Sequence, residues 1–90
     1  MLQFKELHSF VSVVSSGSLS SSAKTLQLSK STLSRHLKNL EQDTGYTLLK
    51  RMPKSLVPTE AGLRFYSYCE QILRIANEAK HELATLDEKI

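Results

Sequence analysis

Residues 29–40 form one helical stretch whose two sides have opposite character, and this limits what the chain can fold into. Leu33, Leu37 and Leu40 fall at positions i, i+4 and i+7, so they make one apolar stripe on a helix. The other side carries hydroxyl and basic side chains at similar spacing, namely Ser31, Ser34, Arg35 and Lys38. We therefore expect one side to be buried and the other to be free to bind an anion.

Length and composition predict one domain in a reducing compartment. Ninety residues, 40% hydrophobic and 23% charged, can bury a modest core without disulfides or metals. The single cysteine, Cys69, has no partner for an internal disulfide. No apolar run approaches the length of a membrane span, and Met1 opens no leader-like segment. We expect a cytoplasmic protein without a membrane partner.

Positive charge is concentrated in the middle of the chain. Residues 20–64 contain eight lysines and arginines against three acidic residues, a net charge of +5, whereas the whole chain carries +3. Residues 65–90 contain three basic and five acidic residues, a net charge of −2. A basic segment flanked by neutral and acidic ones is typical of a surface that binds a polyanion. On charge alone, an ordinary solvated face explains the pattern equally well.

Hydrophobic spacing predicts three helices in the first half of the chain, because apolar residues recur there at intervals of three and four. The expected helices span residues 3–16, 19–26 and about 29–43. Serines stand where helices two and three would begin, and glycines where helices one and three would end. The residues expected to cap or end these helices are Gly17, Ser18 or Ser20, Ser29, Thr44 and Gly45.

The second and third helices together predict a helix-turn-helix, since a tight turn joins them and the later one begins with polar and basic residues. An α-helix fits the DNA major groove, where side chains near its start reach base edges and its amides attract phosphate. The alternative is a surface helix of a small bundle with ordinary solvated charges. The expected DNA contacts on this recognition helix are Lys30, Ser31, Thr32, Ser34, Arg35 and Lys38.

A basic hairpin is predicted after the third helix. Two short apolar runs flank a turn that contains Pro53, a residue tolerated at a turn but not inside a strand ladder. We interpret residues 50–57 as a wing, so the expected fold is mainly α with a small β-hairpin, a winged helix-turn-helix. Arg51 and Lys54 would lie beside the recognition helix and contact phosphate or the adjacent minor groove. The alternative is a structural β-ribbon with incidental charge.

The pattern divides the chain into a winged helix-turn-helix at residues 1–58 and one long helix at 59–90, which Thr59 would cap. Apolar or small residues alternate at intervals of three and four from Gly62 to Ile90, as in a heptad seam. Cys69 lies on this seam, so we interpret it as a packing residue. The small core cannot cover the whole seam, which predicts pairing with a second copy. The expected dimer contacts are Ile72, Ala76, Ala79, Leu83 and Leu86.

Catalytic and metal-binding patterns are missing from the sequence. His8, His36 and His81 are far apart and fall on different expected helices. No nucleophile has an evident base, and no glycine-rich phosphate loop is present. We expect no enzyme activity, no catalytic residue, no metal and no cofactor. His36 is expected to pack at the helix edge or to touch a backbone phosphate.

Short motifs are distributed over nearly the whole chain. In sequence order they are Phe10-x-x-Val13, Gly17-Ser18-Leu19, Ala23-x-x-Leu26, Ser29, Ser34-Arg35, Leu40-Glu41, Gly45, Leu48-Leu49-x-Arg51 and Pro58-Thr59-Glu60-Ala61-Gly62. Each motif is weak alone, but their order and spacing together are specific. Together they resemble the N-terminal domain of LysR-type transcriptional regulators.

This resemblance implies a winged helix-turn-helix, dimers paired through the long linker helices, and binding to interrupted palindromes in double-stranded DNA. The larger effector-binding domain of the family has no counterpart in these 90 residues. No small-molecule ligand is therefore expected here, while a full-length regulator could form tetramers.

The chain departs from the family pattern at several contact positions. Lys30 stands where the family usually has glutamine, Ser31 where it has proline, and Lys54 where it has the wing arginine. Leu49 replaces a usual phenylalanine in the core. Because glutamine can bond adenine in two places and lysine is a point charge, Lys30 favours phosphate contact over the usual base preference.

The competing function is a winged-helix module for protein interaction and dimerisation, with only non-specific affinity for DNA. It predicts weak binding that is indifferent to sequence. Sequence-specific binding instead predicts unequal losses when base-contacting and phosphate-contacting side chains are replaced.

Overall fold

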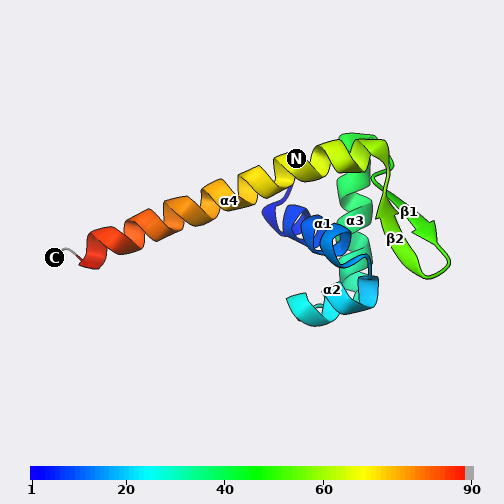
Figure 1. The fold of residues 1–90 in the computed structure, drawn as a ribbon, viewed down its shortest axis with the longest axis horizontal. Coiled ribbons are helices and arrows are strands. Elements are labelled where there is room, and N and C mark those ends of the chain that lie inside the picture. Colours follow the sequence, from blue (N-terminus) through cyan, green and yellow to red (C-terminus); the bar gives the residue numbers. More distant parts are fainter. Residues whose placement is uncertain (89–90) are drawn as a thin grey trace.

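The computed structural model describes residues 1–88 as four helices and a two-stranded antiparallel hairpin (Figure 1). In chain order the elements are α1 (Phe4–Ser16), α2 (Leu19–Leu26), α3 (Lys30–Thr44), β1 (Leu49–Met52), β2 (Ser55–Pro58) and α4 (Glu60–Glu88). The molecule measures 54 × 25 × 20 Å because α4 extends well beyond the body formed by the other elements. The predicted fold class is confirmed.

Capping residues set the helix ends as predicted. Gly17 and Gly45 adopt left-handed conformations with φ of 70° and 78°, and their N–H groups donate to carbonyls of the last turns of α1 and α3. Of the two candidate caps for α2, Ser18 is the one used, and its hydroxyl accepts from the Ser21 N–H at 3.1 Å. Ser29 caps α3 in the same way.

The core lies where α1, α3 and the first turns of α4 meet. Phe10 is fully buried in α1, and its ring centre lies 5.7 Å from that of Phe65 in α4. Both the hairpin and the segment before it contribute a buried leucine. The buried apolar residues are Leu7, Phe10, Val13, Ala23, Leu33, Leu37, Leu40, Leu48, Leu56 and Cys69.

The start of α4 is joined closely to the segment that enters the hairpin. The Thr59 hydroxyl caps α4 by accepting from the Gly62 N–H at 3.0 Å, and it donates to the Thr47 carbonyl at 2.7 Å. A methyl group on Gly62 would overlap the Leu48 carbonyl oxygen, so this crossing requires glycine. The direction in which α4 leaves the body is therefore fixed by close backbone packing.

The predicted heptad seam divides between two faces of α4. Gly62 and Cys69 are buried against the body, and Phe65 is partly buried there. Farther along, Ile72 is exposed, and the side turned toward α1 is occupied by the half-buried Leu73. The part of the seam at Ile90 lies outside the described residues. Among residues 1–88, no helix is long and apolar enough to cross a membrane.

Candidate nucleic-acid interface

The outward face of α3 is formed by the side chains opposite its buried leucines. Ser31, Arg35 and Lys38 are all exposed there, and at 100° per residue they fall within about 60° of one another. Gln42, which sequence reasoning missed because it belongs to no charge pattern, extends this face by one turn and is also exposed. The face is polar and basic along about three turns of the helix.

The first turn of α3 holds its hydroxyl groups in a local network. The Ser29 hydroxyl accepts from the Thr32 N–H at 3.1 Å and donates to the Thr32 hydroxyl oxygen at 2.9 Å. The Ser31 hydroxyl lies 3.2 Å from that of Ser29. Lys30 is exposed beside them and makes no ion pair among the described residues. These contacts order the end of α3 that carries the predicted DNA contacts.

Two predicted contact residues lie on the flanks of α3. Ser34 and Thr32 are half-buried, about 100° to either side of the buried leucine stripe. Sequence reasoning placed Ser34 with the exposed residues, but the body of the protein covers part of it. These two hydroxyls therefore border the outward face, whose centre is formed by Arg35 and Ser31.

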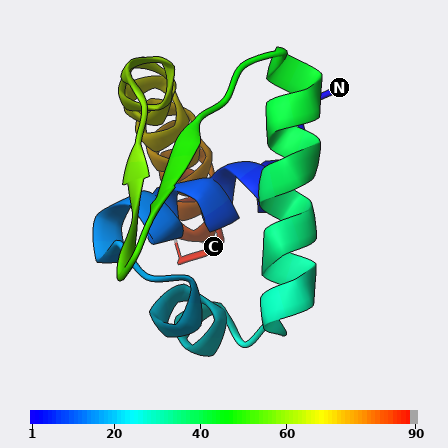
Figure 2. The same ribbon diagram turned by 90° about the vertical axis from the view of Figure 1, so that its right-hand side faces the viewer.

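The wing packs against the end of α1 and the start of α2. In Figure 2 the hairpin overlaps α1 and stands to the left of α3. The hairpin tip carries Arg51 and Lys54, both exposed, and borders a groove of about 300 Å³ with Ser18 and Ser20 at the start of α2. That these basic residues also lie beside the recognition helix stays a prediction. They flank α2, because the Leu56 N–H donates to the Gly17 carbonyl at 3.1 Å and holds the hairpin there.

A carboxylate joins the base of the wing to α3. Oε2 of Glu41 accepts from the backbone N–H groups of Leu48 and Leu49, at 2.7 and 3.2 Å. Leu49 begins the ladder, which pairs Leu49 with Pro58 and Met52 with Ser55. Glu41 therefore positions the wing relative to α3. The sequence motif contained this residue but gave no sign of the contact.

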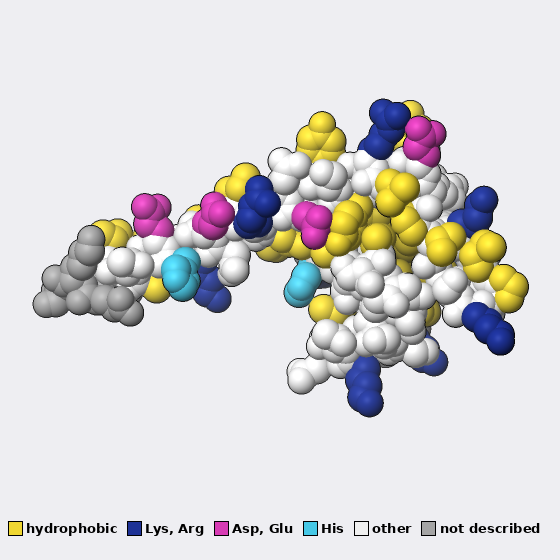
Figure 3. Space-filling view, viewed as in Figure 1, with side chains coloured by type: hydrophobic (Ala, Val, Ile, Leu, Met, Phe, Trp, Pro, Cys, Tyr) yellow, Lys and Arg dark blue, Asp and Glu magenta, His cyan; other side chains and the backbone are white. Residues whose placement is uncertain are grey.

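Acidic side chains gather along α4, where basic side chains accompany them. Figure 3 shows both acidic and basic side chains along α4 and at its start, whereas the charged side chains visible over the hairpin and the lower part of the body are Lys and Arg. Among the described residues, the side-chain ion pairs Arg64 with Glu60 and Arg74 with Glu78 are on α4. The predicted DNA contacts thus stand on the part of the surface where basic charge is least compensated.

His36 is a buried packing residue of α3. Its Nδ1 lies 2.8 Å from the Ser9 hydroxyl of α1. Burial and then the positive charge of Lys5 lower the pKa of His36 below 6.5, Glu6 raises it, and Arg35 lowers it. The alternative that His36 touches a DNA phosphate is therefore wrong, because the ring faces α1.

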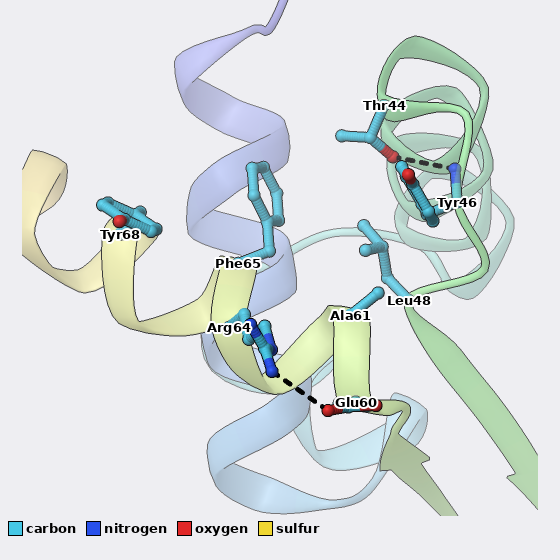
Figure 4. Close-up of a pocket in the computed structure, with 8 residues that line it drawn as sticks. All are labelled: Thr44, Tyr46, Leu48, Glu60, Ala61, Arg64, Phe65 and Tyr68. Atoms are coloured by element: carbon cyan, nitrogen blue, oxygen red, sulfur yellow. Dashed lines mark hydrogen bonds and ion pairs between the residues drawn. The ribbon is translucent and has the colours of Figure 1, made fainter.

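A groove of about 490 Å³ separates the C-terminal end of α3 from the start of α4 (Figure 4). Tyr46, Phe65 and Tyr68 give it an aromatic character, and Arg64 and Glu60 pair at its edge with an N–O distance of 3.1 Å. It lies at the opposite end of α3 from the capping serine. The groove is therefore separate from the outward face of α3.

The second half of α4 presents an unpartnered apolar stripe. Ile75 and Leu83 are 60% and 64% exposed, and Tyr68 adds a further exposed ring on the same side. Of the predicted dimer contacts, Ile72, Ala79, Leu83 and Leu86 are exposed. Ala76 is half-buried and lines a groove with α1. Sequence reasoning missed Ile75 and Tyr68 because the predicted seam passed through Ala76 and Cys69.

The remaining chemical groups behave as structural residues. Cys69 is buried, and burial raises the pKa of its thiol to about 11, which confirms the packing interpretation. Within residues 1–88, no three His, Cys, Asp or Glu side chains approach closely enough to hold a metal ion.

Comparisons with known proteins agree with this geometry. The chain is 44% identical over 73 residues to the iron-regulated virulence regulatory protein IrgB of Vibrio cholerae, which covers 81% of this chain and 24% of IrgB. It is 37% identical over 84 residues to the transcriptional regulator CrgA of Neisseria meningitidis, covering 93% of this chain and 28% of CrgA. The chain thus spans about a quarter of the length of these curated relatives.

Solved structures give the same result for the fold. The DNA-binding domain of BenM in complex with catB site 1 DNA superimposes with a TM-score of 0.89 and 28% identity, covering 96% of this chain and 92% of that one. The model of bacterial regulatory helix-turn-helix proteins of the lysR family matches residues 4–63, which include α1 to β2 and the first turn of α4. The chain belongs to the LysR family of bacterial regulatory helix-turn-helix proteins.

Proposed function

We propose that this chain binds double-stranded DNA sequence-specifically as a homodimer, as the DNA-binding part of a LysR-type transcriptional regulator in the bacterial cytoplasm. In this proposal α3 lies in the major groove. The wing contacts the DNA backbone or the minor groove. The chain acts by binding and carries out no catalysis.

The observation that carries the proposal is the outward face of α3. Buried leucines hold the helix against the body, so Arg35 and Ser31 project away from it, and among the described residues Arg35 has no acidic partner. The arginine has the length and donor geometry to bond guanine O6 and N7, and the small serine permits close approach of the backbone. Lys38 extends the same face by one turn and suits a phosphate contact.

The departures from the family pattern shape the expected specificity. Lys30 is exposed at the first position of α3, where a flexible ammonium group can reach phosphate or a guanine edge. Ser31 keeps its hydroxyl close to Ser29 and adds little bulk. We expect base preference to depend mainly on Arg35, with Lys30 contributing affinity.

Dimerisation follows from the exposed stripe of α4. The side chains of Ile75, Leu83 and Leu86 are open to solvent, and a second copy that covers them lowers the free energy by removing apolar surface from water. Two identical domains related by a two-fold axis would read two inverted half-sites, which is an interrupted palindrome. A full-length regulator could combine two such dimers into a tetramer.

The test is a selection of bound duplexes from a random DNA pool at a stated salt concentration. We expect an enriched motif with two-fold symmetry, because two copies of α3 would contact inverted half-sites. A pool that remains random after several rounds would contradict sequence-specific binding. That outcome would favour the alternative, a protein-interaction module with only non-specific affinity for DNA.

Salt dependence gives a second readout on the selected duplex. Each phosphate that a side chain neutralises contributes about 0.9 to the slope of log K against log salt concentration. The exposed basic residues of α3 and the wing therefore predict a steep slope. A slope near zero would contradict contact with the DNA backbone.

A further inference from the structure

A groove of about 470 Å³ lies on the flank of α3 that faces the N-terminal half of α1. It is bordered by α1, α3, the end of α2 and the turn that follows α2. Sequence reasoning gave no function to the α1 residues that line it. The lining residues are Lys5, His8, Ser9, Leu26, Leu28, Thr32, Arg35 and His36.

Positive charge dominates this groove. Lys5 and Arg35 are exposed at its edge, and no acidic side chain is among the residues that line it. The nearby carboxylate of Glu6 is buried, and its Oε2 accepts from the Asn39 amide at 3.4 Å. Both cations line the same groove as the ring of His36. The groove therefore presents two cations to solvent.

The groove and the wing attachment lie on opposite flanks of α3. Glu41, which ties the wing base to α3, and Thr32, which lines the groove, are about 180° apart around the helix axis. A helix in the major groove has a phosphate strand on each side, since that groove is about 12 Å wide. The wing and the start of α2 can contact the phosphates of one strand. Lys5 lines the groove on the opposite flank of α3, where the other strand would pass.

We infer that Lys5, together with the exposed edge of Arg35, forms a second phosphate-contact site for the DNA strand on the side of α3 opposite the wing. This inference rests on the proposed function. The ligand is a backbone phosphate of the duplex that α3 enters. Lys5 contributes affinity without base preference, while Arg35 lies between this site and the base edges.

The test is Lys5→Ala, measured by fluorescence anisotropy on the selected duplex and on a scrambled duplex across a range of salt concentrations. We expect equal fold losses on both duplexes and a fall of about 0.9 in the salt slope. Lys5→Arg should retain the slope, because the charge is kept. Lys80→Ala is the matched control, since Lys80 is exposed on α4 and is not among the residues that line this groove.

A double variant tests whether the two flanks act independently. Lys5→Ala combined with Lys54→Ala should lower the slope by about 1.8, because each side chain would neutralise a different phosphate. An unchanged slope in Lys5→Ala, with the wild-type chain still binding steeply with salt, would overturn this inference alone. Failure of the wild-type chain to bind either duplex would instead overturn the proposed function.

Discussion

Helices α3 and α4 both carry an apolar stripe, but the protein treats the two stripes differently. In α3 the leucines are buried, and the opposite side exposes Arg35 and Lys38. In α4 the first turns are buried, and the later turns expose Ile75 and Leu83. One chain thus completes the packing of α3, whereas the apolar stripe of α4 stays exposed and would be covered only in the proposed dimer. We infer that folding presents the DNA-binding face and that dimerisation sets the distance between two such faces.

The largest expected effect contrasts a leucine of α3 with one of α4. Leu33→Ala should lower the free energy of unfolding by about 2–5 kcal/mol, because Leu33 is fully buried and the change leaves a cavity. Leu83→Ala should change it by less than about 0.5 kcal/mol in the monomer, because the side chain is already exposed. Urea unfolding at a concentration where the chain is monomeric measures both. Equal losses would contradict the contrast.

A substitution on the exposed stripe of α4 should weaken the dimer and leave the folded body of each chain unchanged. Ala79→Glu should raise the dimer Kd by a hundredfold or more, about 3 kcal/mol, because it buries an unpaired carboxylate in the contact. Sedimentation equilibrium measures the change. Ala84→Glu is the matched control, since it is exposed on α4 about 140° away from Ala79. A variant at Ala79 that remains dimeric would rule out this stripe as the interface.

Replacement of Arg35 tests whether the outward face of α3 contacts base edges. Arg35→Ala should cost about 1–3 kcal/mol on the selected duplex and relax preference at one base pair. The loss on scrambled DNA should be smaller, because direct base contact is absent there. Anisotropy titrations on the two duplexes at one salt concentration give the comparison. Equal losses would count against direct readout by this side chain.

Replacement of Lys54 should show the contrasting behaviour of a phosphate contact. Lys54→Ala at the hairpin tip should weaken binding to all duplexes alike and lower the salt slope by about one. The measurement is the affinity for both duplexes over a range of salt concentrations. A sequence-dependent loss would mean that the wing reads bases.

The smallest expected effect is on pH dependence. The pKa of His36 is lowered in the folded chain, so below pH 6.5 the unfolded chain binds a proton more readily than the folded chain. The contribution of His36 is therefore complete above pH 6.5 and decreases as pH falls. The urea midpoint should decline with acidification more steeply in the wild-type chain than in His36→Gln. Identical pH profiles would contradict this contribution.

Local signals in the sequence were sufficient for most of the fold. The glycines that end α1 and α3 and the serines that cap α2 and α3 act within one turn of the helix, so their spacing predicted the boundaries. The wing is predicted as an element, but its contact with the end of α1 and the start of α2 is not. Its position depends on the Leu56 contact with Gly17, which joins residues far apart in the chain.

The candidate site was predicted in part. The basic face of α3 follows from helical periodicity, so Arg35 and Lys38 were identified correctly as exposed residues. Burial of His36 depends on packing against Ser9, which lies 27 residues away, and periodicity cannot reveal that contact. The exposed stripe through Ile75 was missed for a similar reason, because α1 covers only one side of α4.

The central claim is that Arg35 on the outward face of α3 contacts base edges in the major groove. The most direct test replaces each purine of the selected duplex with its 7-deaza analogue, which removes one major-groove acceptor at a time. At one position the wild-type chain should lose about 1 kcal/mol, and Arg35→Ala should lose nothing further there. If every substitution weakens the wild-type chain and Arg35→Ala equally, or weakens neither, the account is contradicted.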